Sequence, residues 1–299
     1  MSTLVVATRR SALALAQCRG WVRELRVRYP ELTVEELHVT TTGDQVQDRP
    51  LSELGGKGLF TKEIEQALLE GRADIAVHSM KDLPALMDPG LVIGCVPMRE
   101  DPRDILVSRS GKSFEELATG ATVGTGSLRR RAQLCNWRSD VMVIPLRGNV
   151  DTRLRKCSEG QVDAVVLARA GLARLGLLDR VTQVLDVERM LPAIGQGALA
   201  IQRRAADDRV KELLAPLSHS DTATAVAAER GVLEAVEADC TTPVAAYAVR
   251  DGERLWLRAA LADSDCNRLR RLEMRIGWPP RDEEARVAGL ELGRELVGG

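Results

Sequence analysis

The sequence predicts an α/β protein with two lobes, each built on a mixed, largely parallel sheet, followed by a small C-terminal α+β domain. Strand-length apolar runs alternate with segments of helical period through the first two-thirds of the chain, which is typical of parallel sheets joined by helices. In the last third, a long helix leads to a hairpin and a final helix. At 299 residues the chain also exceeds what a single hydrophobic core usually holds.

The first lobe is predicted from the alternation near the N-terminus. The segment after the apolar strand at residues 4–8 predicts a helix that ends before Tyr29 and Pro30, because proline cannot continue a helix. Further strands are predicted at residues 33–40 and 73–80, with a helix at residues 61–70 between them.

The second lobe repeats this alternation between residues 121 and 177. Breaks rich in proline, glycine and charge at residues 97–104 and 191–202 indicate crossovers between the lobes. After them come a helix at about residues 223–236, a hairpin turn at Asp251–Gly252 and a helix at residues 282–296. We therefore expect three domains, formed by residues 1–97 with 198–215, residues 103–191 and residues 220–299.

Composition argues against several classes of partner. The 42 basic and 43 acidic side chains leave a net charge of -1, and only 3% of residues are aromatic, so we expect no nucleic-acid partner. The six cysteines form no C-x-x-C pair and there are three histidines, so we expect no metal site. No stretch approaches the roughly 18 apolar residues of a membrane span, and no signal peptide is evident, so we expect a cytoplasmic protein without a membrane partner.

Arginine side chains gather where strands end and helices begin. Helix N-termini bind anions, whereas arginine is disfavoured in a first helical turn. One such placement is usually a solvated charge, but several together predict an anionic ligand. The residues concerned are Arg9, Ser11, Thr125, Ser127, Arg129, Arg130, Arg147, Arg153 and Arg174.

The glycine-rich segment at residues 54–66 is not a P-loop. Its spacing differs from G-x-x-x-x-G-K-[ST], and Lys57 precedes Gly58 and Leu59 rather than a hydroxyl residue that would hold magnesium. A flexible loop before a helix is the simple interpretation, and a cationic loop beside an anionic ligand is the functional one. A phosphate-transferring enzyme is therefore a weak hypothesis.

The densest group of polar residues lies at the end of the strand at residues 73–80. His78, Ser79, Lys81 and Asp82 fall within five residues there, at the edge where open α/β sheets bind ligands. A structural hydrogen bond is the simpler role for His78. Asp82 is the candidate for acid–base chemistry or for stabilising a cation.

Cys240 lies in a predicted loop, between a helical acidic segment and a Thr-Thr-Pro step. Free cysteine is most often buried in a core, so a structural thiol is the first interpretation. The loop position leaves a functional thiol as the alternative.

Taken in order, these segments resemble the porphobilinogen deaminase family, also called the hydroxymethylbilane synthases. The similar segments run in family order from about residue 7 to the 250s, and the stretch containing AVHSMKD is highly specific. They are ATRRSALAL, GGKGLFTKEIEQALLEGRADIAVHSMKDLP, REDPRD, GTGSLRRRAQL, LRGNVDTRL, LPAIGQGALAI and DCTTPVAAYA.

The resemblance implies two lobes related to type II periplasmic binding proteins and a third domain that carries a covalent cofactor. That cofactor is a dipyrromethane joined by a thioether to Cys240. The implied activity is a transferase of tetrapyrrole (haem) biosynthesis, usually a monomer. It condenses four porphobilinogen molecules head to tail on this primer, releases ammonia at each step and finally hydrolyses off hydroxymethylbilane.

The resemblance also implies roles for the candidate residues. Asp82 is the catalytic carboxylate, which hydrogen-bonds pyrrole N–H groups and stabilises the positive charge that develops on pyrrole nitrogen. Besides Cys240, cofactor contacts are expected from Ser79, Lys81, Asp82, Thr125, Ser127, Arg129, Arg130 and Arg147. Substrate contacts are expected from Arg9, Ser11, Gln17, Lys57, Arg147, Arg153 and Arg174, with Asp44 and Gln196 as weaker candidates.

A non-catalytic carboxylate-binding protein of the same two-lobed fold is the alternative from another class. Such a protein would need neither the third domain nor Asp82. A covalently attached pyrrole discriminates between the two hypotheses, because a simple binding protein carries none.

Overall fold

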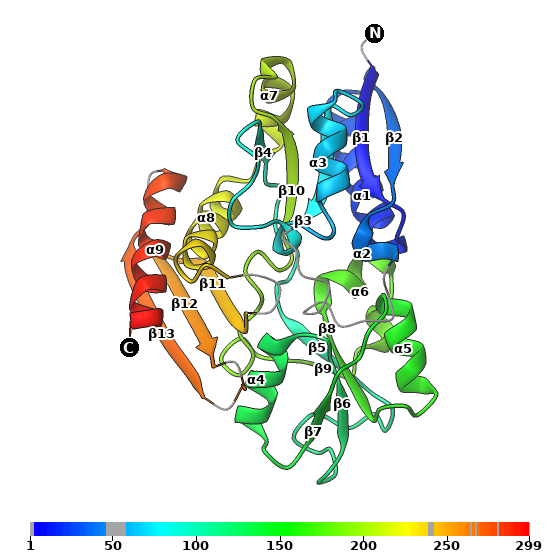
Figure 1. Cartoon of the computed structure of the whole chain (residues 1–299), viewed down its shortest axis with the longest axis vertical. Helices are drawn as coiled ribbons and strands as arrows, with labels where there is room; N and C mark the ends of the chain where they lie inside the picture. The colour runs from blue at the N-terminus through cyan, green and yellow to red at the C-terminus, as the bar shows by residue number, and fades with distance from the viewer. Residues whose placement is uncertain are drawn as a thin grey trace. The chain divides into compact units, whose positions relative to one another are not determined.

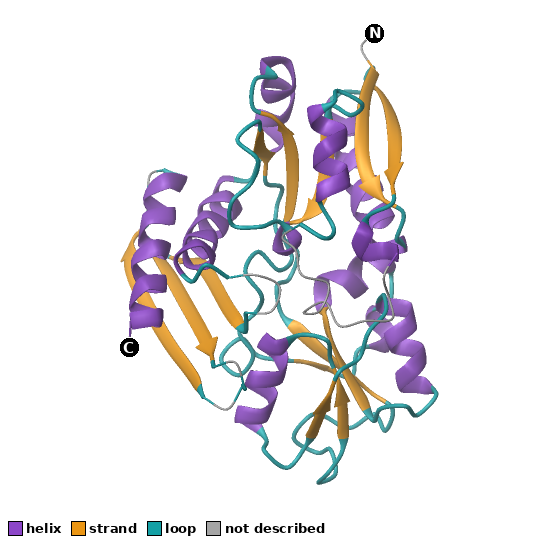
Figure 2. Ribbon diagram, in the orientation of Figure 1, coloured by secondary structure: helices purple, strands orange, loops and turns teal. Residues whose placement is uncertain are grey.

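A computed structural model describes residues 3–45, 58–238, 242–263, 265–266, 268–279 and 281–298. The chain divides into two compact units, formed by residues 1–99 with 198–223 and by residues 100–197 with 224–299. Figure 2 shows helices alternating with strands in both sheet-containing lobes.

The first lobe is a five-stranded sheet with helices on both faces (Figure 1). Its strand order is β2-β1-β3-β10-β4, and β10 runs antiparallel to its neighbours β3 and β4. The strands are β1 (Thr3–Arg9), β2 (Thr33–Val39), β3 (Ile75–Ser79), β4 (Leu91–Cys95) and β10 (Leu199–Arg204). The helices are α1 (Ala12–Arg28), α2 (Thr42–Gln45), α3 (Lys62–Leu69) and α7 (Asp208–Leu214).

Alternation along the strands builds the core of this lobe. Val6 and Val77 pack with α1 and α7 on one face, while Ala7 and Ala76 pack with α3 on the other. Successive strand residues point to opposite faces, so a strand that is apolar throughout must be covered on both sides.

The second lobe has the same pattern of strand directions as the first, although its antiparallel strand comes first along the chain rather than last. Its order is β7-β6-β8-β5-β9, and β5 again runs antiparallel to both of its neighbours. The strands are β5 (Asp104–Ser108), β6 (Thr122–Gly124), β7 (Met142–Ile144), β8 (Ala164–Ala168) and β9 (Gln183–Val184). The helices are α4 (Leu128–Trp137), α5 (Val150–Ser158) and α6 (Arg169–Leu175), of which α4 and α5 pack on opposite faces of the sheet.

The C-terminal region is an antiparallel meander covered by two helices. Strands β11 (Val244–Asp251), β12 (Arg254–Ala262) and β13 (Leu269–Gly277) bury one face against α8 (Ser220–Ala235) and α9 (Asp282–Gly298). The two helices touch through glycine, since a Cβ atom on Gly289 would come within 1.9 Å of Ala228 O. Only glycine permits so close an approach.

The predicted fold class is confirmed, and the predicted hairpin turn at Asp251–Gly252 joins β11 to β12. Several bounds differ from the prediction by one to three residues. The largest shift is at α8, which begins at Ser220 rather than at about residue 223. The boundaries of the three predicted domains stay a prediction. Among the described residues, no helix is long and apolar enough to cross a membrane.

Candidate functional site

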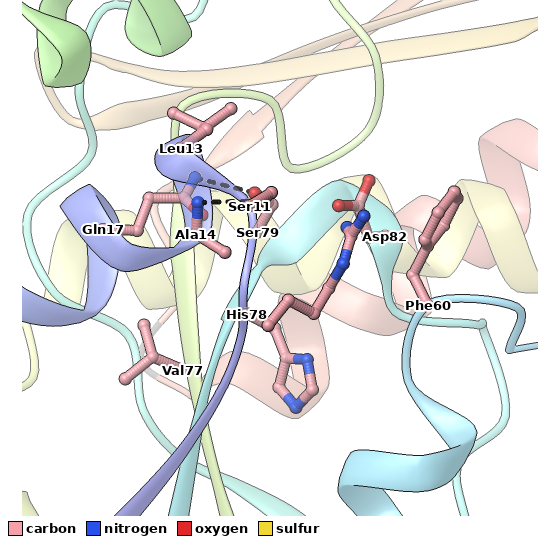
Figure 3. A pocket seen from close by; sticks show the side chains of 10 residues that line it. Ser11, Leu13, Ala14, Gln17, Phe60, Val77, His78, Ser79 and Asp82 are labelled. Carbon is pink, nitrogen blue, oxygen red and sulfur yellow. Dashed lines mark hydrogen bonds between the residues drawn. The ribbon is translucent and has the colours of Figure 1, made fainter. Parts of the chain in front are cut away.

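A pocket in the first unit lies at the carboxyl ends of β1 and β3 (Figure 3). Parallel strands bring the residues that follow them to one edge of the sheet, so segments far apart in the sequence meet there. Its polar and aromatic lining comprises Arg9, Ser11, Gln17, Phe60, His78, Ser79 and Asp82. All of these except Phe60 are residues that the sequence analysis singled out.

Ser11 caps the helix that borders the pocket. Its backbone is extended and its hydroxyl accepts a hydrogen bond from the Ala14 N–H at 3.3 Å. The first turn of α1 contains no acidic side chain, so the positive end of the helix dipole is left for an anion.

Gln17 and Ser79 join α1 to β3. The Gln17 side chain is buried, and its Nε2 donates to Ser79 Oγ at 2.8 Å (Figure 3). With its oxygen used as the acceptor, the Ser79 hydroxyl keeps its own hydrogen for another partner.

His78 is buried and neutral. Its Nε2 lies 3.1 Å from Gln202 Oε1, while Gln202 Nε2 donates to Glu65 Oε1 at 2.9 Å. Because an amide oxygen only accepts, Nε2 of His78 carries the proton. Burial lowers the pKa of His78 to about 4. This is the structural role that the sequence favoured for His78. Separately, the described residues include no cluster of His, Cys, Asp and Glu that could hold a metal ion.

Asp82 ends the short 3-10 turn Met80–Asp82 that follows β3. Met80 is buried, whereas Asp82 is half-buried in the pocket and Lys81 is exposed. The Arg9 guanidinium carbon lies 4.2 Å from the centre of the Phe60 ring, a cation–π distance. Phe60 could not be predicted from the sequence, because nothing in its segment shows that it meets Arg9.

In the second unit, Arg129 and Arg130 converge on a buried acid. Both arginines are 5% exposed and Asp104 is 0% exposed. Arg129 Nη2 lies 2.8 Å from Asp104 Oδ2, and Arg130 Nη2 lies 2.8 Å from Asp104 Oδ1. Ser127 caps α4, its hydroxyl accepting from the Arg130 N–H at 3.4 Å. Sequence reasoning missed Asp104, which is the last residue of the charged segment REDPRD and resembles an ordinary turn residue.

Gln196 completes the surroundings of Asp104. Its Nε2 lies 2.9 Å from Asp104 Oδ1 and 2.7 Å from Pro102 O, donating to both. Burial alone would raise the pKa of Asp104, but Arg129 and Arg130 outweigh it and hold the pKa at about 2. The carboxylate is therefore ionised throughout the physiological range.

Three further arginines lie in this unit with few acids around them. Arg153 Nε donates to Gly148 O at 2.7 Å, and burial, together with Arg130 and Arg147, lowers the pKa of Arg153 to about 10. Arg147 Nη1 is buried with no hydrogen-bond partner among the described residues. Arg174 donates to Gly197 O at 2.7 Å, and burial lowers the pKa of Arg174 also.

Thr125 is buried and supports the turn before α4. Its hydroxyl accepts from the Ser127 N–H at 3.2 Å. Arg130, just after this turn, and Arg147 both lie close enough to Arg153 to lower its pKa, so the three guanidiniums form a cationic group whose charge an anion could neutralise.

The buried side chain of Glu229, in α8, accepts hydrogen bonds from the loop before β10 and from strand β11. Its side chain is 0% exposed, its Oε2 accepts from the Gly195 N–H at 2.7 Å, and its Oε1 accepts from the Ala248 N–H at 2.9 Å. Sequence reasoning missed this residue too, since one acid in a helix usually faces water. Three candidates lie outside the description, namely Lys57, Cys240 and the side chain of Asp44.

Two family models and many curated proteins match this chain. The model "Porphobilinogen deaminase, dipyromethane cofactor binding domain" matches residues 4–212, and "Porphobilinogen deaminase, C-terminal domain" matches residues 223–298. A porphobilinogen deaminase of Sorangium cellulosum is 58% identical over 99% of this chain and 99% of its own length. One from Syntrophotalea carbinolica is 49% identical over 99% of this chain and 93% of its own.

Solved structures with a similar fold are far more distant in sequence. The periplasmic aliphatic sulphonate binding protein SsuA of Escherichia coli aligns with a TM-score of 0.43 at 16% identity, over 79% of this chain and 70% of that one. Membership therefore rests on the sequence matches, which are strong and span nearly every residue. The chain belongs to the porphobilinogen deaminase family.

Proposed function

We propose that this chain is a hydroxymethylbilane synthase, a transferase of tetrapyrrole (haem) biosynthesis. It condenses four porphobilinogen molecules head to tail on a dipyrromethane held by Cys240, releases ammonia at each condensation and hydrolyses the product to hydroxymethylbilane. Family membership over both matched regions supports this activity. The structural observation that carries it is the cationic group of Arg130, which is buried, and Arg147 and Arg153, which are partly buried; the Nη1 atom of Arg147 has no hydrogen-bond partner among the described residues.

The residues present fit a polycarboxylate cofactor. Each pyrrole ring carries an acetate and a propionate, and planar guanidinium groups bind carboxylates in bidentate fashion. The buried Nη1 of Arg147 lacks a hydrogen-bond partner among the described residues, which is costly unless an anion binds there. We assign the cofactor carboxylates to Thr125, Ser127, Arg129, Arg130 and Arg147, with Ser79 and Lys81 from the first lobe.

When bound, the dipyrromethane supplies a primer whose free α-carbon is the nucleophile. The chain's own residues bind and orient the carboxylates and stabilise the charge that develops. The Asp82 carboxylate accepts hydrogen bonds from pyrrole N–H groups and stabilises positive charge on the ring nitrogen, as a preorganised carboxylate can in a partly buried pocket. Arg9, Ser11, Gln17, Arg147, Arg153, Arg174 and Lys57 bind and orient the carboxylates of porphobilinogen.

The proposal extends to organisation and location. We assign three domains, residues 1–97 with 198–215, residues 103–191 and residues 220–299, since three separate sheets each have a core of their own. The net charge of -1 supports a protein without a nucleic-acid partner. We also expect a cytoplasmic monomer without a membrane partner. A non-catalytic carboxylate-binding protein is not favoured, because it would leave Asp82 without a task.

Intact-protein mass spectrometry tests the proposal directly. We expect the purified protein to exceed its sequence mass by one dipyrromethane and the Cys240→Ser variant to lack that excess. Cys135→Ser is the matched control, because Cys135 is a free and partly exposed thiol far from Cys240 in the sequence, and it should keep the adduct. A wild-type mass equal to the bare sequence, persisting after incubation with porphobilinogen, would contradict the proposal.

A further inference from the structure

Asp104 is the acid around which the arginines of α4 are arranged. It is the first residue of β5, the antiparallel strand of its sheet, and it is fully buried. Its Oδ1 accepts from Arg130 Nη2 at 2.8 Å, from Arg130 Nε at 3.2 Å and from Gln196 Nε2 at 2.9 Å. Its Oδ2 lies 2.8 Å from Arg129 Nη2.

This carboxylate brings together two side chains that the helix would separate. Arg129 and Arg130 are consecutive in α4, and consecutive helical side chains point roughly 100° apart around the axis. Both guanidiniums nevertheless reach Asp104, and each also donates to a backbone carbonyl, of Leu191 and Val166 respectively. A long arginine side chain is costly to order, so such fixing lowers the cost of a later binding step.

Fixing these arginines does not use all their hydrogen-bonding capacity. A guanidinium has five N–H groups. Arg130 uses Nε, one N–H of Nη1 and one N–H of Nη2 in these contacts, which leaves one N–H on each terminal nitrogen. Arg129 Nε is buried without a hydrogen-bond partner among the described residues.

The charge around Asp104 also points to an anion. One carboxylate faces both Arg129 and Arg130, while Arg130 and Arg147 both lie close enough to Arg153 to affect it electrostatically. Asp104 therefore neutralises only part of the positive charge of these arginines. Its carboxylate holds the Arg129 and Arg130 guanidiniums side by side in a buried site, and the positive charge that remains can bind further carboxylates.

We propose that Asp104 is a positioning residue, which holds Arg129 and Arg130 so that their remaining N–H groups bind carboxylates of the cofactor. This inference rests on the function proposed above. Gln196, through its bond to Asp104 Oδ1, fixes the carboxylate in turn.

The test compares the fraction of protein that carries the covalent pyrrole. We expect folded Asp104→Asn to carry about fivefold less adduct than the wild type, because asparagine keeps the shape but removes the charge that pairs both guanidiniums. Asp104→Glu restores the charge and should recover part of the adduct. The matched control is Asp163→Asn in the same lobe, whose carboxylate bonds Thr122 and Arg109 rather than Arg129 or Arg130, and it should keep a wild-type adduct fraction.

Full adduct in folded Asp104→Asn would overturn the proposal, as would equal loss in the Asn and Glu variants. If Asp104→Asn does not fold, Gln196→Met decides, because it removes one bond to Asp104 and leaves every charge in place. Its adduct fraction should fall by about twofold, and an unchanged fraction would overturn the proposal. An adduct missing from the wild type contradicts the proposed function itself, whereas equal adduct in wild type and Asp104→Asn contradicts only the role of Asp104.

Discussion

The two sheet-containing lobes share a pattern of strand directions but carry different chemistry. In each, the antiparallel strand takes the fourth place in the sheet, β10 in the first lobe and β5 in the second, although β10 comes last in its lobe along the chain and β5 comes first. In each, the second strand of the sheet, β1 or β6, leads to a serine that caps a helix, Ser11 or Ser127. The strand beside it, β3 or β8, then supplies the next loop at the same edge.

The side chains that follow the third strand of each sheet differ. In the first lobe β3 ends at Ser79 and is followed by Lys81 and the carboxylate of Asp82, whereas in the second lobe β8 is followed by α6, which carries Arg169 and Arg174. The antiparallel strand also differs, since β10 contributes the neutral Gln202 beside His78 and β5 contributes the ionised Asp104 beside two arginines. Topology decides where side chains gather, and their identity decides what they can do.

The largest expected effect tests whether the catalytic carboxylate is Asp82 of the first lobe. Asp82→Asn keeps the size of the side chain and removes its charge, so turnover of porphobilinogen should fall about 10²–10⁴-fold while the covalent adduct is kept. Product formation and intact mass measure the two quantities. Asp88→Asn, at an exposed acid of the same lobe, is the control and should leave turnover near wild type. Near-normal turnover by Asp82→Asn would remove the proposed role.

A second expected difference concerns acid stability. His78 has a folded pKa of about 4 against 6.5 in the unfolded chain, so the unfolded state binds its proton first and the first lobe loses stability as pH falls from 6.5 to 4. Asp104, with a folded pKa of about 2 against 3.8, costs the second lobe stability only below pH 3.8. The first lobe should therefore weaken at a higher pH than the second.

Urea unfolding at pH 7 and pH 4.5 measures this difference. We expect the first lobe to lose about 2 kcal/mol more in the wild type than in His78→Gln, which cannot titrate. Trp21 is buried in that lobe and its fluorescence reports on it. His38→Gln replaces an exposed histidine of the same lobe and should behave like the wild type. Equal pH dependence with and without His78 would show that its burial does not govern acid stability.

The fold of the two lobes and part of the candidate site could be predicted from the sequence. Alternating apolar runs predicted the strands of both lobes, and the sequence placed Ser11 and Ser127 where a strand ends and a helix begins, although it did not predict that they cap those helices. Asp82 stood out because it follows an apolar strand directly. These features are local, so one segment of sequence contains the whole signal.

Residues whose roles depend on distant partners share a different property. Asp104 is recognised only with Arg130, 26 residues away, and Glu229 only with Gly195, 34 residues away. His78 becomes neutral because Gln202, 124 residues away, accepts from it and because the surrounding sheet buries it. Gly289 is needed because α8 passes close by. Each depends on tertiary packing, which periodicity and spacing do not reveal.

The smallest expected effect tests whether the helix caps contribute equally to the stability of the two lobes. The caps Ser11 and Ser127 accept from the third helical N–H at 3.3 and 3.4 Å, so Ser11→Ala and Ser127→Ala should each cost about 0.5–1 kcal/mol of unfolding free energy.

Aspartate also caps helices, so Ser11→Asp and Ser127→Asp should recover that stability. Because its charge repels carboxylates, however, Ser127→Asp should still lower the adduct fraction, and Ser11→Asp should raise KM for porphobilinogen. Unfolding curves, intact mass and steady-state kinetics separate capping from ligand binding. If the aspartate variants recover both stability and binding, these serines serve only as caps, and the equivalence of the two lobes is one of scaffold alone.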